Sequence, residues 1–282
     1  MKVWLNGSIV DARDARIDPA DRGFLLGDGL FETMLALHGH PVFAGAHMLR
    51  LKAGTELIGL PLPYAPDAIE AACIEILEAN GLDAAPRASL RVTVTRGPGP
   101  RGLALPPEPK PTVLVSGATA GEPPARLSLA TAMPRRNPWS PSARLKALPY
   151  LDNLLAKEEA REKGADDALM LSTNGAIACT SAANIFLWED GKLITPSQNC
   201  GILPGITRAA LLELAPDIGI DIAEEEILPA RLAHISGAFA TNSLMGLVPI
   251  DRIDGRDIPA HPMTARLAAA YELLLDAADE EG

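Results

Sequence analysis

The segment from Leu145 to Phe186 constrains the fold of this chain more than any other. It reads LKALPYLDNLLAKEEAREKGADDALMLSTNGAIACTSAANIF, in which a lysine precedes an amphipathic helix, a strand, a turn and a second strand. Helical spacing of apolar residues changes there into short apolar runs bounded by turn residues. The order of these elements predicts a lobe that mixes helices with strands and carries Lys146 just ahead of a helix.

The remainder of the chain also reads as alternating helices and strands. Asn6-Gly7 separates two short runs within Lys2 to Val10 and predicts a hairpin. His38-Gly39-His40 reads as a second turn. Apolar periodicity predicts strands over 30–37, 90–94 and 112–116, and helices over 46–58, 66–79, 151–163, 206–215 and 263–278.

Two irregular stretches suggest how the chain divides. The run RGPGPRGLALPPEPKP is too rich in Gly and Pro for regular structure. The small, polar and Pro-containing residues 117–125 suit a linker. We therefore expect two α/β lobes, a smaller N-terminal lobe over 1–120 and a larger C-terminal lobe over 121–282.

Composition excludes several classes of protein. With 282 residues, of which 48% are hydrophobic and 22% charged, the chain has ample material for an apolar core. A net charge of −11 argues against sequence-independent binding to nucleic acid, which needs clustered Lys and Arg. No segment approaches the length of a membrane span, and Cys73, Cys179 and Cys200 show neither zinc nor disulfide spacing. We expect a cytoplasmic enzyme that binds no metal, nucleic acid or membrane.

A possible anion site lies at Gly205-Ile206-Thr207. These residues begin a predicted helix, where free backbone amides and the positive end of the helix dipole attract anions. The Thr207 hydroxyl can add to such a site, or it can simply cap the helix. The three residues alone leave both explanations open.

Taken together, the motifs resemble the class IV aminotransferases. This group of pyridoxal-phosphate enzymes includes branched-chain and D-amino-acid aminotransferases and aminodeoxychorismate lyase. The resemblance rests on the lysine-helix-strand unit, on LPGITR (203–208) and on DRGFLLGDGLFET (21–33), and it extends to Val248-Pro249-Ile250. It implies the two-lobe α/β fold of D-amino-acid aminotransferase, pyridoxal-phosphate fold type IV. It further implies that the cofactor lies between the lobes of a homodimer, with a loop of the partner subunit in each active site.

The resemblance also implies roles for individual residues around the cofactor. Lys146 would form the Schiff base with pyridoxal phosphate and then carry the substrate α-proton. Arg50 in HMLRL would bind the phosphate, although its position also suits a surface helix arginine. The other residues placed at the cofactor by this resemblance are Tyr150, Cys179, Asn184, Ile206, Thr207 and Ser243.

Substrate contacts are expected from two motifs and one turn. Phe31 occupies a position that faces the substrate and that holds tyrosine in bacterial D-amino-acid aminotransferases. Arg101 in RGPGPRG is the candidate carboxylate clamp, since a planar guanidinium binds a carboxylate through two bonds, or it is an ordinary loop arginine. Leu103 stands where the D-specific enzymes have histidine. Leu244 and Met245 are the remaining candidates.

Cys179 departs from the pattern of the family. Most relatives have a glutamate at this position, where it pairs with the pyridine nitrogen of the cofactor and keeps the ring protonated. A thiol holds that proton less well, and three explanations follow: weak catalysis, another partner for the nitrogen, or a reaction that depends less on a long-lived carbanion. The third explanation, together with TNSLMGLVPI and TRGPGPRGLALPP, favours an aminodeoxychorismate-lyase-like enzyme that releases pyruvate and leaves 4-aminobenzoate. The alternatives are a branched-chain or D-amino-acid aminotransferase and a catalytically weak cofactor-binding homologue.

Overall fold

The computed structural model describes residues 1–280, which pack as two compact units. Unit 1 contains residues 1–121 and 145–149 together with the end of the last helix from residue 276. Unit 2 contains residues 122–144 and 150–275. The segment 145–149 therefore packs in unit 1 although the chain has already passed the boundary expected near residue 120. The lobes 1–120 and 121–282 remain a proposal for the division into domains.

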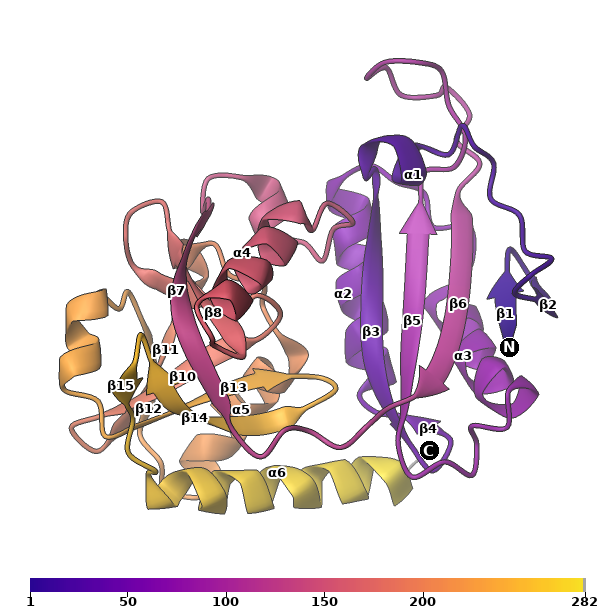
Figure 1. Ribbon diagram of the computed structural model, residues 1–282. Helices are drawn as coiled ribbons and strands as arrows, with labels where there is room; N and C mark the ends of the chain where they lie inside the picture. Colours follow the sequence, from indigo (N-terminus) through magenta and orange to yellow (C-terminus); the bar gives the residue numbers. More distant parts are fainter. Residues whose placement is uncertain (281–282) are drawn as a thin grey trace. The chain divides into compact units, whose positions relative to one another are not determined.

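Unit 1 is an antiparallel sheet with two long helices on one face (Figure 1). The strand order is β2-β1-β6-β5-β3-β4. The strands are β1 (Lys2–Leu5), β2 (Ser8–Asp11), β3 (Gly29–Leu37), β4 (His40–Pro41), β5 (Ala88–Thr95) and β6 (Thr112–Thr119). The helices are the short α1 (Arg22–Leu26) and the two covering helices α2 (Ala44–Leu57) and α3 (Pro66–Ala79).

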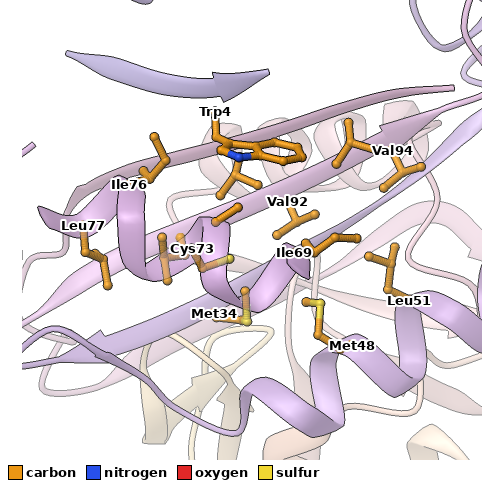
Figure 2. Close-up of a cluster of buried hydrophobic side chains, with 14 of the residues drawn as sticks. Trp4, Met34, Met48, Leu51, Ile69, Cys73, Ile76, Leu77, Val92 and Val94 are labelled. Atoms are coloured by element: carbon orange, nitrogen blue, oxygen red, sulfur yellow. The ribbon is translucent and has the colours of Figure 1, made fainter. Parts of the chain in front are cut away.

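The core of unit 1 lies between this sheet and helices α2 and α3 (Figure 2). Alternating residues of β5, among them Val92 and Val94, point toward the helices and are fully buried. Helix α3 begins with Pro66 at its first turn and buries Ile69, Cys73, Ile76 and Leu77 at helical spacing. The sequence patterns for β5 and α3 are thereby confirmed.

Two tight turns fix the register of the edge hairpins. Asn6 and Gly7 both have positive φ, 49° and 93°, as the two-residue turn between antiparallel strands requires. His38 and Gly39 repeat this geometry between β3 and β4, with φ of 46° and 93°. The turns predicted at Asn6-Gly7 and at His38-Gly39 are confirmed, although His40 already belongs to β4.

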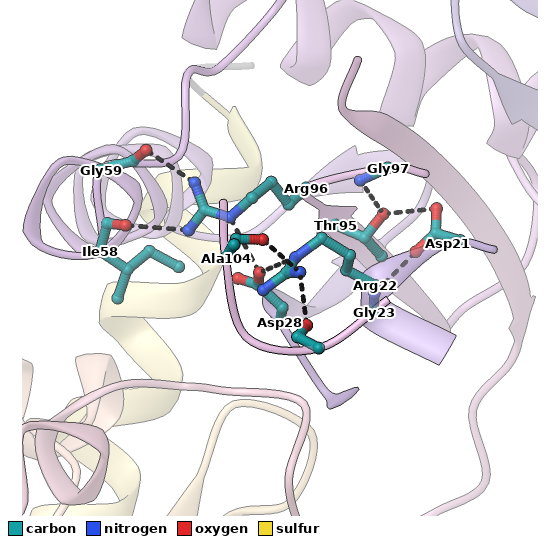
Figure 3. Close-up of polar contacts among 11 residues, drawn as sticks. Asp21, Arg22, Gly23, Asp28, Ile58, Gly59, Thr95, Arg96, Gly97 and Ala104 are labelled. Atoms are coloured by element: carbon teal, nitrogen blue, oxygen red, sulfur yellow. Dashed lines mark hydrogen bonds and ion pairs between the residues drawn. The ribbon is translucent and has the colours of Figure 1, made fainter. Parts of the chain in front are cut away.

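A partly buried acidic group anchors the irregular loop that follows β5 (Figure 3). Asp28 Oδ2 accepts hydrogen bonds from Arg22 Nε at 2.8 Å and from Arg96 Nε at 2.9 Å. Arg22 Nη1 in turn donates to the carbonyl oxygens of Gly102 at 3.3 Å and Ala104 at 3.0 Å. Arg22 therefore ties the Gly- and Pro-rich loop to the start of β3.

Unit 2 is built on a larger mixed sheet. Its strand order is β12-β11-β10-β13-β14-β7-β8-β9, with β15 paired to β14. The strands are β7 (Leu127–Arg136), β8 (Asp167–Ser172), β9 (Ile177–Cys179), β10 (Asn184–Glu189), β11 (Lys192–Pro196), β12 (Ile222–Glu225), β13 (Gly237–Asn242), β14 (Gly246–Ile253) and β15 (Arg256–Asp257). The helices are α4 (Leu151–Glu162), α5 (Ile206–Asp217) and α6 (Pro262–Glu280). Helix α4 packs on β7 and β8, and α5 packs near β12 and β13.

The mixed α/β class expected from the sequence is thus confirmed. One local expectation needs correction: the linker predicted over 117–125 begins later, because β6 continues to Thr119 and pairs there with Ala88. No helix within residues 1–280 has the length and apolar character needed to span a membrane.

Candidate active site

Lys146 lies in an extended segment that adds to the edge of β3. The backbone amide of Phe31 donates to the carbonyl oxygen of Lys146 at 2.9 Å, and the amide of Leu148 donates to Gly29 O at 3.0 Å. Leu30 and Ala147 form the bridge between these two hydrogen bonds. The lysine predicted to be reactive is therefore held by backbone pairing in unit 1, ahead of α4 in sequence.

The surroundings of Lys146 lower its proton affinity. Burial is the largest cause, the positive charges of Arg50 and Arg91 add to it, and the negative charge of Glu32 opposes it. The pKa of Lys146 falls from 10.5 to about 8. The fraction of neutral amine near neutral pH, about a tenth at pH 7, is therefore far larger than that of an ordinary lysine, and the neutral amine is the state that attacks a carbonyl carbon.

Arg50 is joined to a buried carboxylate on β3. Arg50 Nε and Nη2 donate to the two oxygens of Glu32 at 2.8 and 2.5 Å. His47, one turn earlier on α2, contacts Glu32 Oε2 through Nδ1 at 2.8 Å. Hydrogen bonds from Arg50 and His47 outweigh the effect of burial and hold the pKa of Glu32 below its ordinary value. Arg50 is thus a partly buried, oriented cation rather than a solvated surface arginine.

Phe31 is approached by two positively charged groups. The Arg91 guanidinium carbon lies 3.9 Å from the centroid of the Phe31 ring, and Lys146 Nζ lies 4.5 Å from it. Both distances are within the range of cation–π attraction. Arg91 comes from β5, where it pairs with Thr33 on the same face of the sheet as Phe31.

Arg91 was not among the candidate residues predicted from the sequence. Alternation in LRVTVT marked Arg91 only as the outward-facing residue of a half-buried strand. Its position beside Phe31 depends on the register of β3 against β5, which a single sequence does not display. The available signal for Arg91 as a site residue was the presence of an arginine in a predicted strand that otherwise consists of apolar and β-branched residues.

Arg101 lies elsewhere in unit 1. Its side chain is exposed on the loop that follows β5. Pro100 precedes it in the chain, and Gly102 and Ala104, whose carbonyl oxygens accept hydrogen bonds from Arg22, follow it. Its assignment as a carboxylate clamp stays a prediction.

In unit 2, helix α5 begins with a compact turn suited to an anion. Gly205 is its N-cap and contributes no side-chain cap, so the first amides of the helix are not satisfied by that route. A Cβ at Gly205 would lie 2.0 Å from Asn184 Oδ1, so any other residue would displace the Asn184 amide or the turn. Asn184 Nδ2 also donates to Leu203 O at 3.0 Å and ties LPGITR to the start of β10. Ile206 and the buried Thr207 follow as the first residues of the helix.

The turn between β13 and β14 carries three further candidates. Asn242 Oδ1 accepts hydrogen bonds from the backbone amides of Leu244 at 3.0 Å and Met245 at 2.9 Å, which fixes the turn around Ser243. Thr241, just before this turn, pairs with Asn184 across the two strands. Its hydroxyl oxygen is one of the few buried side-chain nitrogen and oxygen atoms of the described residues that have no hydrogen-bond partner.

Cys179 ends β9 in a small apolar cluster. It packs with residues such as Met170, Ala178 and Cys200. Burial raises the pKa of its thiol to about 11, so the group is neutral at physiological pH. Tyr150, the remaining cofactor candidate, is half-buried at the N-cap of α4.

The chain resembles one family of known proteins over most of its length. The profile of the family "Amino-transferase class IV" matches residues 29–253. A putative branched-chain-amino-acid aminotransferase of Methanocaldococcus jannaschii is 34% identical over 92% of this chain and 90% of its own length. The aminodeoxychorismate lyase of Bacillus subtilis is 30% identical over 89% of this chain and 86% of its own length.

Solved structures extend this similarity to the fold. The branched-chain aminotransferase of Thermoproteus uzoniensis, crystallised with norvaline, is 29% identical and superposes with a TM-score of 0.92. The superposition covers 100% of this chain and 96% of that one. The fold expected from the sequence motifs is therefore confirmed over the length of the chain.

Proposed function

Since the chain belongs to the class IV aminotransferase family of pyridoxal-phosphate-dependent enzymes, we propose that it eliminates pyruvate from aminodeoxychorismate and leaves 4-aminobenzoate. The cofactor and the enzyme class follow from the family. The choice of reaction is the proposal, and the neutral thiol at Cys179 is the observation that carries it.

The residues of the chain fit the cofactor. A phosphate ester needs backbone amides, hydroxyls and a cation, and the glycine-bounded start of α5, the buried hydroxyl of Thr241 and the oriented Arg50 guanidinium are groups of these kinds. Lys146 has the lowered proton affinity that covalent attachment of an aldehyde requires. The groups proposed to hold the phosphate are Arg50, Ile206, Thr207 and Ser243, and we add the hydroxyl of Thr241 to them.

When bound, pyridoxal phosphate would supply an electron sink for a bond broken at the amino-bearing carbon of the substrate. Lys146 Nζ would take the proton from that carbon, the C–O bond to the neighbouring enolpyruvyl group would break, and Lys146 Nζ would return the proton to the methylene carbon of the departing group, which gives pyruvate. The Phe31 ring lies beside Lys146 Nζ and is almost fully buried, so it would limit the access of water to the lysine amine. Arg91 and Arg101 are proposed to bind the carboxylates of the substrate.

Cys179 favours elimination over amino-group transfer. A carboxylate at this position would hold a proton on the ring nitrogen and so favour a long-lived carbanion. The Cys179 thiol is neutral and sits among alanine and other apolar side chains. Elimination discharges the carbanion by expelling a leaving group, so it tolerates a neutral partner better than transamination does.

Amino-group transfer on a branched-chain or D-amino acid is the second candidate. Its support is the higher identity to the M. jannaschii relative, 34% against 30% for the B. subtilis lyase. The two reactions differ in what they need and in what they form. Transamination needs an oxo-acid acceptor and yields a new amino acid, whereas the lyase reaction needs no acceptor. A third candidate, cofactor binding with little catalysis, is motivated by the same Cys179.

We further propose that the protein is a homodimer that uses one end of unit 1. Phe24 and Leu25 of α1 are 77% and 58% exposed, and Leu103 in the loop after β5 is 83% exposed. Arg22 ties this loop to α1, and Figure 1 shows both at the same end of the sheet. An apolar surface of this kind is covered in solution by a second copy when the protein dimerises. Replacement of Leu103 by aspartate should shift the mass measured by light scattering toward the monomer.

The lyase proposal is tested with the purified, cofactor-loaded protein and aminodeoxychorismate. Steady release of fluorescent 4-aminobenzoate in the absence of any oxo acid is the expected result. Absence of that release, with new amino acid formed from an amino donor and an oxo acid, would establish the aminotransferase instead. Neither product, with the cofactor covalently bound, would support the third candidate.

A further inference from the structure

Glu32 is a carboxylate in an unfavourable place for a charge. It is 1% exposed on the helix-facing side of β3, where its neighbours along the strand, Leu30 and Met34, belong to the apolar core. Taking an ionised carboxylate out of water costs several kcal/mol unless close partners compensate for it. Packing alone does not account for such a residue.

The partners of Glu32 are arranged as a fork. Arg50 donates to both carboxylate oxygens, through Nε to Oε1 and through Nη2 to Oε2. Two parallel hydrogen bonds fix the plane and the direction of a guanidinium, which a single bond does not. His47 makes the third contact, at 2.8 Å to Oε2, from the preceding turn of α2.

The protonation states within this cluster follow from its geometry. The pKa of Glu32 lies below its ordinary value, so the carboxylate is ionised and only accepts hydrogen bonds. Burial lowers the pKa of His47, and the charges of Arg50 and Lys146 act in the same direction, while Glu32 opposes them. His47 is therefore a neutral imidazole whose Nδ1 carries the hydrogen.

Lys146 experiences charges from three elements. Arg50 on α2 and Arg91 on β5 disfavour its protonated form, and Glu32 on β3 favours it. His47 is neutral and contributes no charge. Glu32 is thus the anion that offsets two nearby cations at the reactive lysine.

We propose that Glu32 is a positioning residue for cofactor binding: it aims the Arg50 guanidinium by its two oxygens and balances the positive charge around Lys146. His47 supports this role by holding Oε2 in place. The proposal rests on the assigned roles of Arg50 and Lys146 toward the cofactor, and it adds two separable effects, one of geometry and one of charge.

The effect of charge is tested on the cofactor-free protein. Cyanate carbamoylates neutral amines, so the pH profile of Lys146 carbamoylation, read by peptide mass mapping, reports the protonation of this residue. For Glu32→Gln we expect the profile to move to the acid side by about one pH unit, which makes carbamoylation at pH 7 about fivefold faster. Glu56→Gln, which removes an exposed carboxylate from the same helix as Arg50, is the matched control and should leave the profile unchanged.

The effect of geometry is tested with Glu32→Asp. This variant keeps the charge but shortens the side chain by one methylene, so both oxygens no longer reach Arg50 together. Binding of 4-deoxypyridoxine 5′-phosphate, which carries the phosphate but no aldehyde, should weaken by about tenfold because the guanidinium is no longer preorganised. The carbamoylation profile of Glu32→Asp should stay close to that of the wild type.

Two outcomes overturn the proposal. A folded Glu32→Gln protein with an unchanged carbamoylation profile would remove the effect of charge, and a folded Glu32→Asp protein with unchanged affinity would remove the effect of geometry. If Glu32→Gln does not fold, Glu32→Asp still decides the geometric half. Failure of the underlying assignment is separable, because wild-type protein would then fix the reduced cofactor at a lysine other than Lys146.

Discussion

The amide of Phe31 donates to the carbonyl oxygen of Lys146 at 2.9 Å, so the reactive lysine and the ring beside it are fixed by one backbone contact. The same pair meets again through the side chains, where Lys146 Nζ lies 4.5 Å from the ring centroid. A single extended segment added to β3 thus places the lysine beside the Phe31 ring.

The first prediction concerns pH. Because the pKa of Lys146 is lowered to about 8, the neutral amine is the minor form at pH 6.5 and the major form above pH 8. The rate of covalent capture of pyridoxal phosphate by the cofactor-free protein should therefore rise with pH and level off above about pH 8. The absorbance of the bound cofactor measures this rate.

The cofactor itself titrates, so the reaction with free Nα-acetyllysine serves as the control. Because the control amine has the ordinary lysine pKa, the ratio of the protein rate to the control rate should be constant below about pH 8 and should fall between pH 8 and 10.5. A ratio that stays constant up to pH 10.5 would show that the site does not depress the proton affinity of Lys146.

The second prediction concerns Cys179. Replacement by glutamate places a carboxylate where most relatives have one, and protonation of the ring nitrogen is then favoured. We expect transamination by Cys179→Glu to exceed that of the wild type by about tenfold or more. The measurement is amino acid formed from a panel of oxo acids with one amino donor.

Cys179→Ser, which is neutral and similar in size, is the control and should leave the transamination rate near that of the wild type. A folded Cys179→Glu protein without any gain would show that position 179 does not act on the cofactor ring.

Local chemistry made much of the fold predictable. Asn6-Gly7 demands positive φ at two successive residues, so its hairpin could be placed from the sequence. Pro66 and the spacing of Ile69, Cys73 and Ile76 gave α3 its bounds, 66–79. The end of β6 was less predictable, since Thr119 belongs to the strand only through its pairing with Ala88.

The site was predictable only where a motif marked it. The LPGITR motif indicated Thr207, and the lysine segment indicated Lys146. The packing of Lys146 on β3 could not be predicted in this way, because it arises from pairing between residues far apart in sequence. Arg91 was missed for the same reason, because its contact with Phe31 depends on strand register. Glu32 had a signal that could have been used: it is the charged residue in the otherwise apolar strand LFETMLAL.

The third prediction concerns the start of α5. In Gly205→Ala the new Cβ would lie 2.0 Å from Asn184 Oδ1, so either the Asn184 amide, which holds this turn through Leu203 O, or the turn itself must shift. We expect the affinity for 4-deoxypyridoxine 5′-phosphate to fall by about tenfold or more, because the helix amides move with that turn. Fluorescence titration of the cofactor-free protein measures the loss.

Gly121→Ala is the control, since a Cβ there meets nothing within 4 Å and the backbone is not strained. Its affinity should equal that of the wild type. Equal affinity in Gly205→Ala would mean that this turn does not bind the phosphate.

The fourth prediction concerns the acidic anchor of the loop after β5. Asp28→Asn leaves the buried guanidinium groups of Arg22 and Arg96 without their anion. Removing one member of a buried ion pair costs about 3–5 kcal/mol, and the partial exposure of Asp28 places the expected loss at the lower end. Urea unfolding gives the free energy, and proteolysis should become faster within the loop that carries Arg101.

The pH dependence of this contribution has a defined sign. Hydrogen bonds from Arg96 and Arg22 outweigh burial and hold the pKa of Asp28 below 3.8. The stabilisation is therefore complete above pH 3.8 and is lost as the pH falls through the lower, folded-state value. Asp257→Asn, in an exposed pair with Arg252, should change the free energy of unfolding by less than about 1 kcal/mol. A similar small change in Asp28→Asn would contradict the anchoring role.

Borohydride reduction of the cofactor-loaded protein, followed by peptide mapping, identifies the lysine that binds the cofactor. We expect a single labelled lysine, Lys146, and loss of that label in Lys146→Ala but not in Lys157→Ala, which changes an exposed lysine of α4. A label on any other lysine, or a label that persists in Lys146→Ala, would contradict the assignment of the active site.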